Sequence, residues 1–211
     1  MGYNVIGDIA GRADELFQLL KLMPDDEPVS VGDMIDRHDQ SREVVEFFMK
    51  NGKAIYGNHE DLMLNDCRNT NFYPYGCWIR NGGGPTLASF AGTIPEEVLT
   101  WVEYLPKYLE LEGCLISHAF VDSIYDTPEL ACNFGCDSND WPMDYSIIWN
   151  RLAPISRDKY VRQIAGHNSQ MGLMDFSDKD GIYATCIDDS RNRKLTGIHI
   201  PSFKIYQVEY I

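Results

Sequence analysis

The chain has 211 residues, of which 44% are hydrophobic and 24% are charged, a composition typical of globular proteins and unlike that of disordered ones. This length favours a single domain, 1–211, over two. The net charge of −14 argues against nucleic-acid polymers and anionic membranes as partners, because the protein as a whole would repel them. No apolar stretch approaches the length that spans a bilayer.

The six cysteines bear on the cellular compartment. A candidate strand begins at residue 3, which leaves no room for a secretory signal. We therefore expect reduced thiols and a cytoplasmic protein. Cys132 and Cys136 form the one close pair, and no second pair at zinc-finger spacing accompanies them.

The first third of the chain repeats one pattern three times, a β-prone segment followed by a polar phrase. The segments are 3–6, 28–31 and 53–56, and the phrases are Gly-Asp-Ile-Ala-Gly at 7–11, Gly-Asp-Met-Ile-Asp-Arg at 32–37 and Gly-Asn-His-Glu at 57–60. Apolar residues at helical spacing over 14–23 and 41–50 predict helices between the strands. A recurrence of 25 residues is near the length of a βαβ unit, which predicts parallel strands with right-handed crossovers.

The rest of the chain predicts a helical insert, further strands and one long loop. Residues 60–105 have a helical or irregular pattern, and we interpret them as an insert that covers one side of the site. Strands are predicted at 109–117 and 160–165, and a long loop at 122–145. The segments 181–187, 195–200 and 203–210 alternate apolar and polar residues, which predicts an antiparallel meander.

Polar side chains follow five of the predicted strands. In open α/β sheets, ligands bind at the carboxyl ends of the strands. The three early phrases and two later strand ends deliver Asp8, Asp33, Asp36, Arg37, Asn58, His59, His118 and His167. Hard oxygen ligands, a guanidinium group and imidazoles together are typical of a metal-assisted phosphate site.

These phrases, taken in order, resemble the calcineurin-like metallophosphoesterases. The resemblance is carried by Gly-Asp-x-x-Gly, Gly-Asp-x-x-Asp-Arg, Gly-Asn-His-Glu, a later Ser-His and a final Gly-His. Ile-Trp-Asn-Arg at 148–151 and Asn-Gly-Gly-Gly at 81–84 are similar to the bacterial and lambda-phage type of serine/threonine protein phosphatase. The resemblance implies an α/β fold in which helices flank a mixed β-sheet sandwich, with the helical insert at about 60–105.

The resemblance also implies a pair of divalent metal ions. Asp33 would bridge them, and Asp8 would belong to the first ion. Asn58, His118 and His167 would complete the second. Two closely spaced cations lower the pKa of a bridging water and neutralise charge on the phosphoryl group.

By the same resemblance, three further residues would act on the substrate and a fourth would orient one of them. Arg37 and Arg151 would hold the phosphate oxygens, because planar guanidinium groups pair with them. His59, oriented by Asp36, would protonate the leaving group.

Three positions depart from the family pattern. Ala10 stands where the family has a metal-binding histidine, His38 stands where glycine is usual, and Ile-Asp-Asp-Ser at 187–190 stands where Asp-Thr-Gly is usual. Without the imidazole, the first metal site keeps carboxylates and water, which favours magnesium or manganese, while the nitrogen-richer second site favours manganese, iron or zinc. We expect manganese, with one ion held tightly and the other recruited with the substrate.

Two other side chains lie near the expected site. His38 is expected to face solvent or substrate rather than a metal. Arg12 follows the first phrase directly and could touch substrate, although an ordinary solvated arginine is the expectation.

Three functions remain open. The first is hydrolysis of phosphate monoesters, in phosphoproteins or small phosphate esters. The second is hydrolysis of dinucleoside polyphosphates, as in symmetrical diadenosine tetraphosphatases, whose motifs are nearly the same. The third is a degenerate homologue that binds metal or a phosphorylated partner without turnover, which Ala10 permits. His59 and the two arginines argue against the third, because a pure binder needs no general acid.

Overall fold

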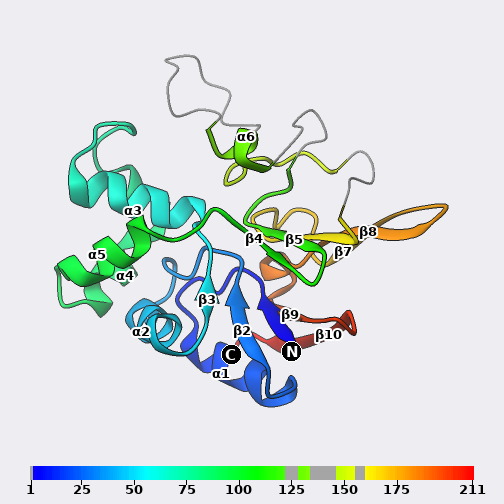
Figure 1. The fold of residues 1–211 in the computed structure, drawn as a ribbon. Coiled ribbons are helices and arrows are strands. Elements are labelled where there is room, and N and C mark those ends of the chain that lie inside the picture. Colours follow the sequence, from blue (N-terminus) through cyan, green and yellow to red (C-terminus); the bar gives the residue numbers. More distant parts are fainter. Residues whose placement is uncertain (1, 122–127, 134–145, 155–159) are drawn as a thin grey trace.

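Two five-stranded β-sheets form the centre of the fold (Figure 1). The computed structural model describes residues 2–121, 128–133, 146–154 and 160–211. The first sheet contains, in spatial order, β10 (Lys204–Glu209), β9 (Lys194–Ile200), β1 (Tyr3–Ile6), β2 (Glu27–Ser30) and β3 (Lys53–Ala54). The second contains β4 (Tyr108–Leu111), β5 (Cys114–Ser117), β6 (Arg162–Ala165), β8 (Gly181–Cys186) and β7 (Met174–Asp178). Both sheets mix parallel and antiparallel pairs, so the predicted mixed-sheet α/β class is confirmed.

The repeated pattern at the start of the chain builds the parallel part of the first sheet. Helix α1 (Ala13–Leu22) connects β1 to β2, and α2 (Ser41–Asn51) connects β2 to β3. Strand β1 pairs with β2 in parallel, and β2 pairs with β3 in the same sense. The crossover arrangement expected from the 25-residue recurrence is therefore present, although β3 is shorter than the predicted segment 53–56.

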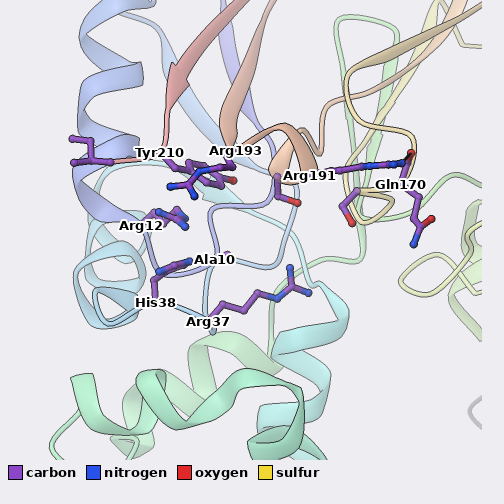
Figure 2. Close-up of a pocket in the computed structure, with 11 residues that line it drawn as sticks. Ala10, Arg12, Arg37, His38, Gln170, Arg191, Arg193 and Tyr210 are labelled. Carbon is purple, nitrogen blue, oxygen red and sulfur yellow. Dashed lines mark hydrogen bonds between the residues drawn. The ribbon is translucent and has the colours of Figure 1, made fainter.

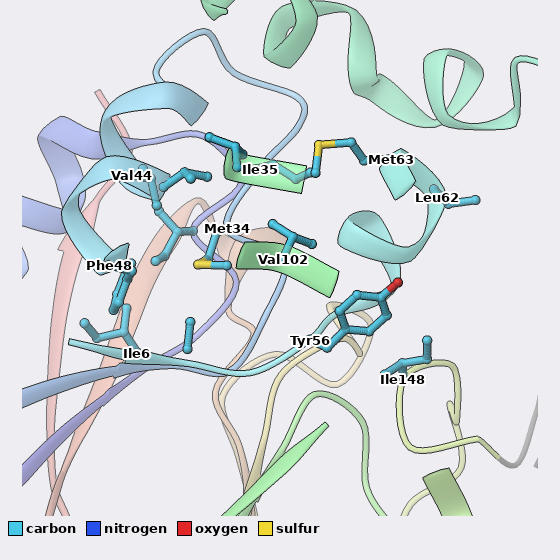
Figure 3. Close-up of a cluster of buried hydrophobic side chains, with 14 of the residues drawn as sticks. Ile6, Met34, Ile35, Val44, Phe48, Tyr56, Leu62, Met63, Val102 and Ile148 are labelled. Atoms are coloured by element: carbon cyan, nitrogen blue, oxygen red, sulfur yellow. The ribbon is translucent and has the colours of Figure 1, made fainter. Parts of the chain in front are cut away.

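The two faces of the first sheet pack against different layers. Ile6 points towards the helices and lies in one buried cluster with Val44 and Phe48 of α2 (Figure 3). Its neighbour Val5 points the other way, as successive strand residues do. It belongs to a second cluster with Ile116 of β5 in the other sheet. Side chains from both sheets therefore fill the interior of a sandwich.

The predicted helical insert is confirmed and lies beside α2 (Figure 1). It comprises α3 (Asn58–Arg68), a π-helical turn η1 (Ile79–Gly83), α4 (Gly84–Ser89) and α5 (Glu96–Glu103). Helix α5 begins directly after Pro95 and carries Glu96 and Glu97 in its first turn. Acidic side chains there interact favourably with the positive end of the helix dipole. Contacts of α4 with α2 hold the insert against the body of the fold, and contacts of α5 with α3 join the helices of the insert to each other.

The single strand predicted at 109–117 is wrong, because the structure has a hairpin there. Strands β4 and β5 pair antiparallel, with Leu111 opposite Cys114. The two turn residues, Glu112 and Gly113, both have positive φ, of 48° and 77°. This backbone matches the tight turns that join antiparallel strands, and it reverses the chain in the middle of an apolar run.

The predicted meander at the end of the chain is only partly present. Strands β9 and β10 do pair antiparallel, but β8 lies in the other sheet, parallel to β6. The alternation of apolar and polar residues identifies these strands and does not say which sheet each one joins. Strand β7 was not predicted, because it is an edge strand with no buried residue and so carries no apolar alternation.

The long loop predicted at 122–145 falls largely outside the described residues. The part that is described contains a short helix, α6 (Pro128–Asn133), so this part of the prediction is wrong. Among the described helices, none combines the length and the apolar character needed to cross a bilayer.

Candidate metal centre

The strand ends bring all five predicted metal ligands together between the two sheets. Asp8, Asp33 and Asn58 follow β1, β2 and β3, while His118 and His167 follow β5 and β6. All five are buried. A cavity of about 90 Å³ lies among them and is called the small cavity below; its lining includes Asp8, Asp33, Arg37, Asn58, His59, Arg151, His167 and Asp188.

Four of these side chains converge on one point. One ligand atom from each of Asp33, His118 and His167 lies within 4.8 Å of the other two. Asn58 Oδ1 is 2.8 Å from His118 Nε2 and 2.9 Å from His167 Nδ1. The four donor groups of the second metal position that the family resemblance implies therefore lie together.

The hydrogen bond on the outer side of each imidazole ring indicates which ring nitrogen directs its lone pair towards this point. His118 Nδ1 lies 2.9 Å from the carbonyl oxygen of Val31, and His167 Nε2 lies 3.2 Å from that of Trp149. Each of these nitrogens therefore donates its N–H outwards, as metal-binding histidines do. Burial lowers the pKa of both His118 and His167, which keeps the rings neutral.

The inward-facing atoms are consequently all acceptors. With the Asn58 amide oxygen assigned to this side, it faces the lone pairs of two ring nitrogens and the Asp33 carboxylate, with no proton between them. Such a set is unfavourable by itself and is satisfied by a divalent cation. The residues present therefore fit a metal ion.

A second group of acceptors lies beside the first and consists of carboxylates. Asp8 and Asp33 line the small cavity together with Asp188. Burial raises the pKa of Asp8 well above its ordinary value, and the neighbouring Asp188 and Asp33 carboxylates raise it further. Burial also raises the pKa of Asp188. Repulsion among buried carboxylates is what a hard cation relieves, so this group fits a second ion.

Asp188 was not among the site residues predicted from the sequence. In the sequence it belongs to Ile-Asp-Asp-Ser at 187–190, a segment that departs from the family pattern. The strand-end rule that identified the other ligands could have found it, because Asp188 follows β8, which lies next to β6 in the second sheet.

Ala10 faces a different space. Its side chain lines a larger cavity of about 800 Å³, together with Arg12, Arg37, Arg191, Arg193 and Tyr210. We call this space the arginine cavity. His38 also lines it, so this side chain faces neither of the two acceptor groups directly.

His59 lies at the edge of the small cavity with both ring nitrogens engaged. Its Nδ1 is 2.6 Å from Asp36 Oδ2, and its Nε2 is 3.1 Å from Arg37 Nη2. Burial lowers the pKa of His59, but the carboxylates of Asp33 and Asp36 outweigh this effect and raise it overall. Nδ1–H donates to Asp36 and Nε2 accepts from the Arg37 guanidinium group, so Nε2 is the ring nitrogen that can take up a proton on the side of the cavity.

Asp36 is fixed by two residues of the helical insert that sequence reasoning missed. Trp78 Nε1 donates to its carboxylate at 2.9 Å, and Thr86 Oγ1 donates at 2.7 Å. Asp36 itself is fully buried. The insert therefore does more than cover the site, since it holds the carboxylate that orients His59.

The two predicted phosphate-binding arginines, Arg37 and Arg151, both line the small cavity. The backbone N–H of Arg37 donates to the carbonyl of Gly82 at 2.9 Å. Gly82 has φ +106°, and a Cβ there would lie 3.2 Å from Arg37 Cγ. Glycine at this position thus allows the insert to approach and support the arginine.

Glu60, the last residue of the third phrase, ties two loops together. Its carboxylate accepts hydrogen bonds from the backbone N–H groups of Asp33, Met34 and Gly57, at 2.9, 2.9 and 3.0 Å. A Cβ on Gly57 would lie 2.5 Å from the Asp33 nitrogen. These contacts fix the position of Asp33 relative to Asn58.

A mixed-sheet sandwich with buried acceptor groups at its strand ends defines a phosphoesterase of the metal-binding type. The family model for the calcineurin-like phosphoesterases matches residues 3–170, and the chain belongs to this family.

Among curated proteins, the chain is similar to a symmetrical bis(5'-nucleosyl)-tetraphosphatase from Vibrio parahaemolyticus serotype O3:K6 (strain RIMD 2210633). The two are 29% identical over 133 residues, which cover 60% of this chain and 47% of the relative. The chain thus matches about half the length of that relative.

Solved structures share the fold. A protein provisionally named as a diadenosine tetraphosphatase has a TM-score of 0.69 and 18% identity, and the match covers 100% of this chain and 94% of that chain. A cold-active protein-tyrosine phosphatase from a psychrophilic Shewanella species has a TM-score of 0.64 and 15% identity, covering 98% of this chain and 77% of that chain.

Proposed function

We propose that the protein is a phosphatase that hydrolyses phosphate monoesters by attack of a metal-activated water at phosphorus. One observation carries the proposal. The small cavity is lined at once by acceptor groups that fit two cations, by Arg37 and Arg151, and by His59. These are the three elements that phosphoryl transfer to water requires.

The chain offers two adjoining positions for the ions. Asp33, Asn58, His118 and His167 would hold one of them. Asp8 and Asp188, with Asp33 shared, would hold the other. Bound divalent cations supply an acidified water and neutralise phosphoryl charge. The ligand chemistry favours manganese, with magnesium, iron and zinc as alternatives.

The remaining residues act on the substrate directly. Arg37 and Arg151 would bind the phosphoryl oxygens through their paired N–H groups and orient the phosphorus in the small cavity. His59 Nε2 would donate a proton to the leaving oxygen, while Asp36 keeps the ring in place.

A second candidate is hydrolysis of dinucleoside polyphosphates. The name of the Vibrio relative favours it, and so does the arginine cavity beside the small one. Binding without turnover is less well supported, because the pair His59 and Asp36 has the geometry of a proton donor.

The cellular location stays a prediction. Cys67, Cys77, Cys114 and Cys186, the four cysteines that the structure describes fully, are free thiols.

A substrate panel tests the proposed function. We expect hydrolysis of p-nitrophenyl phosphate with Mn²⁺ present and its loss after chelation, because the nucleophile depends on the cations. Phosphoserine peptides and diadenosine tetraphosphate, measured in parallel, separate the two candidate substrates. Absence of turnover on all three with Mn²⁺, Mg²⁺, Fe²⁺ or Zn²⁺ would contradict the proposal and favour a binding protein.

Asp188→Asn should weaken binding of the more loosely held ion by about tenfold, because the number of charged ligands sets cation affinity. The tighter site, which does not include Asp188, should keep its affinity. Calorimetric titration with Mn²⁺, with and without inorganic phosphate, measures both affinities independently of activity.

Asp180→Asn is the matched control, because Asp180 is exposed at the turn between β7 and β8. Unchanged affinities in Asp188→Asn would remove this residue from the metal centre. Two equally tight sites in the unmodified protein without phosphate would contradict the expected asymmetry.

A further inference from the structure

Trp149 contacts the metal centre from the second half of the chain. It lies in the described segment 146–154 and lines the small cavity, as does Arg151 two residues later. Its carbonyl oxygen is the acceptor 3.2 Å from His167 Nε2, and its ring meets the His167 ring nearly at a right angle, with 6.0 Å between the centroids. The position of Trp149 therefore affects a candidate metal ligand and the segment that carries a candidate phosphate-binding arginine.

The indole of Trp149 is held by a residue of the helical insert. Trp149 Nε1 donates to the hydroxyl oxygen of Tyr73 at 3.1 Å, and the two ring centroids are 6.2 Å apart. Tyr73 is buried and lies between α3 and η1. An indole N–H can only donate, so the tyrosine oxygen supplies the acceptor that this side chain needs. The insert thus contacts the segment 146–154 through one directed hydrogen bond.

The Tyr73 hydroxyl is itself oriented by Asp61 of α3. It donates its proton to Asp61 Oδ2, which leaves the oxygen able to accept from Trp149. Asp61 Oδ1 accepts a second hydrogen bond, from the Tyr56 hydroxyl at 2.8 Å. Tyr56 and Asp61 stand at the two ends of the phrase Gly-Asn-His-Glu at 57–60. The hydroxyl is therefore anchored beside the third phrase of the site.

These hydrogen bonds form one path outside the tighter metal site. The path begins at Asp61, three residues after the ligand Asn58. It passes through Tyr73 and Trp149 to the ligand His167. Asn58 follows a strand of the first sheet and His167 follows a strand of the second. Two ligands from different sheets are thus connected by side chains behind them as well as across the site itself.

The side of the site that faces the arginine cavity is held by other contacts (Figure 2). The backbone N–H of Arg37 donates to a carbonyl of η1, and its Nη2 lies 3.1 Å from His59 Nε2. Arg12 is not the solvated side chain expected from the sequence, because only 14% of it is exposed and its Nη1 lies 3.1 Å from Glu15 Oε1. A change on the path should therefore affect phosphate binding through Arg151.

We propose that Tyr73 is a positioning residue for the metal centre, whose hydroxyl fixes Trp149 and thereby the orientation of His167 and the place of Arg151. The part that concerns Arg151 rests on the proposed function, whereas the part that concerns His167 requires only a bound metal ion. A hydrogen bond to the outer nitrogen of a metal-binding imidazole sets the direction of the inner lone pair. If the Trp149 carbonyl is free to move, that direction is less well defined.

Tyr73→Phe tests the role, because it removes one hydroxyl and keeps the ring. We expect the tighter site to bind Mn²⁺ about tenfold more weakly by calorimetry, since the hydrogen-bond partners of metal ligands change affinity by about 10–100-fold. At saturating Mn²⁺, KM for p-nitrophenyl phosphate should rise more than kcat falls. Asp61 keeps the Tyr56 hydroxyl as a donor, so thermal unfolding of the metal-free variant should show a folded protein. Tyr75→Phe is the matched control, because Tyr75 lies in the same insert and is 93% exposed.

A double-mutant cycle separates positioning from packing. Trp149→Phe removes the N–H of the same hydrogen bond, so it should weaken Mn²⁺ binding to the same extent as Tyr73→Phe. Combining the two substitutions should then cause no further loss. Additive losses would show that Tyr73 does not act through Trp149 and would refute the inference.

The Mn²⁺ titration also separates this inference from the proposed function. A tenfold loss of affinity in Tyr73→Phe, in a protein that hydrolyses none of the substrates, would support the positioning role and refute the proposed function. Hydrolysis of p-nitrophenyl phosphate with the same Mn²⁺ affinity and the same KM in both proteins would refute the inference alone.

Discussion

Asp33→Asn is expected to reduce the rate of p-nitrophenyl phosphate hydrolysis by about 10³-fold or more. The reason is that weaker metal binding costs the transition state several kcal/mol of stabilisation. Asp33 is the one residue shared by both acceptor groups. Asparagine has the same size as aspartate, and its side-chain oxygen can still accept the hydrogen bond from the backbone N–H of His59, which is 3.0 Å from Asp33 Oδ1. The loss should therefore arise from the missing charge and not from a collapsed loop.

Two measurements on Asp33→Asn separate these causes. Calorimetric titration should show weaker binding of Mn²⁺ at both positions, and thermal unfolding of the metal-free variant should show a folded protein. Asp39→Asn serves as control, because Asp39 is exposed and lies in the same loop. Wild-type turnover in Asp33→Asn would show that the metal assignment is wrong.

The parts of the fold that follow from local periodicity were predictable. The β1–α1–β2–α2–β3 unit alternates short apolar, β-prone segments with helices whose apolar residues recur at helical spacing, and each strand pairs with the next strand of the unit. The hairpin at Glu112 and Gly113 interrupts an apolar run with only one glycine as a signal. Long-range packing decides which sheet the strands near the C-terminal end of the sequence join, and the local sequence pattern does not predict it.

At the site, too, the local sequence predicted some residues, whereas others are brought in only by the tertiary fold. Asp8, Asp33 and Asn58 were predictable because each directly follows a strand of the parallel unit. Trp78 and Thr86 hold Asp36 from 42 and 50 residues away, so no spacing rule indicates them. The arginine cavity has the same origin, because its charges come from both ends of the chain and meet only in the folded structure.

His59→Asn should lower turnover by about 10²–10⁴-fold on an alkyl phosphate and by much less on p-nitrophenyl phosphate. The reason lies in the leaving group. An alkoxide is strongly basic and needs a proton as the P–O bond breaks, whereas p-nitrophenolate is stable without one. His59 lines the small cavity beside Arg37, with Nδ1 held by Asp36 and Nε2 accepting from Arg37. The carboxylates of Asp33 and Asp36 raise the pKa of His59, and once protonated at Nε2 the ring is placed to supply that proton.

The comparison of the two leaving groups is the decisive measurement, because it cancels any effect of the substitution on metal binding or phosphate binding. His199→Asn is the matched control, since His199 lies in β9 and its Nε2 is 3.0 Å from Asp26 Oδ2, away from both cavities. It should leave both rates unchanged. If His59→Asn slows both substrates by the same factor, His59 acts on a step common to both, such as phosphate binding beside Arg37, and the leaving oxygen takes its proton from another source.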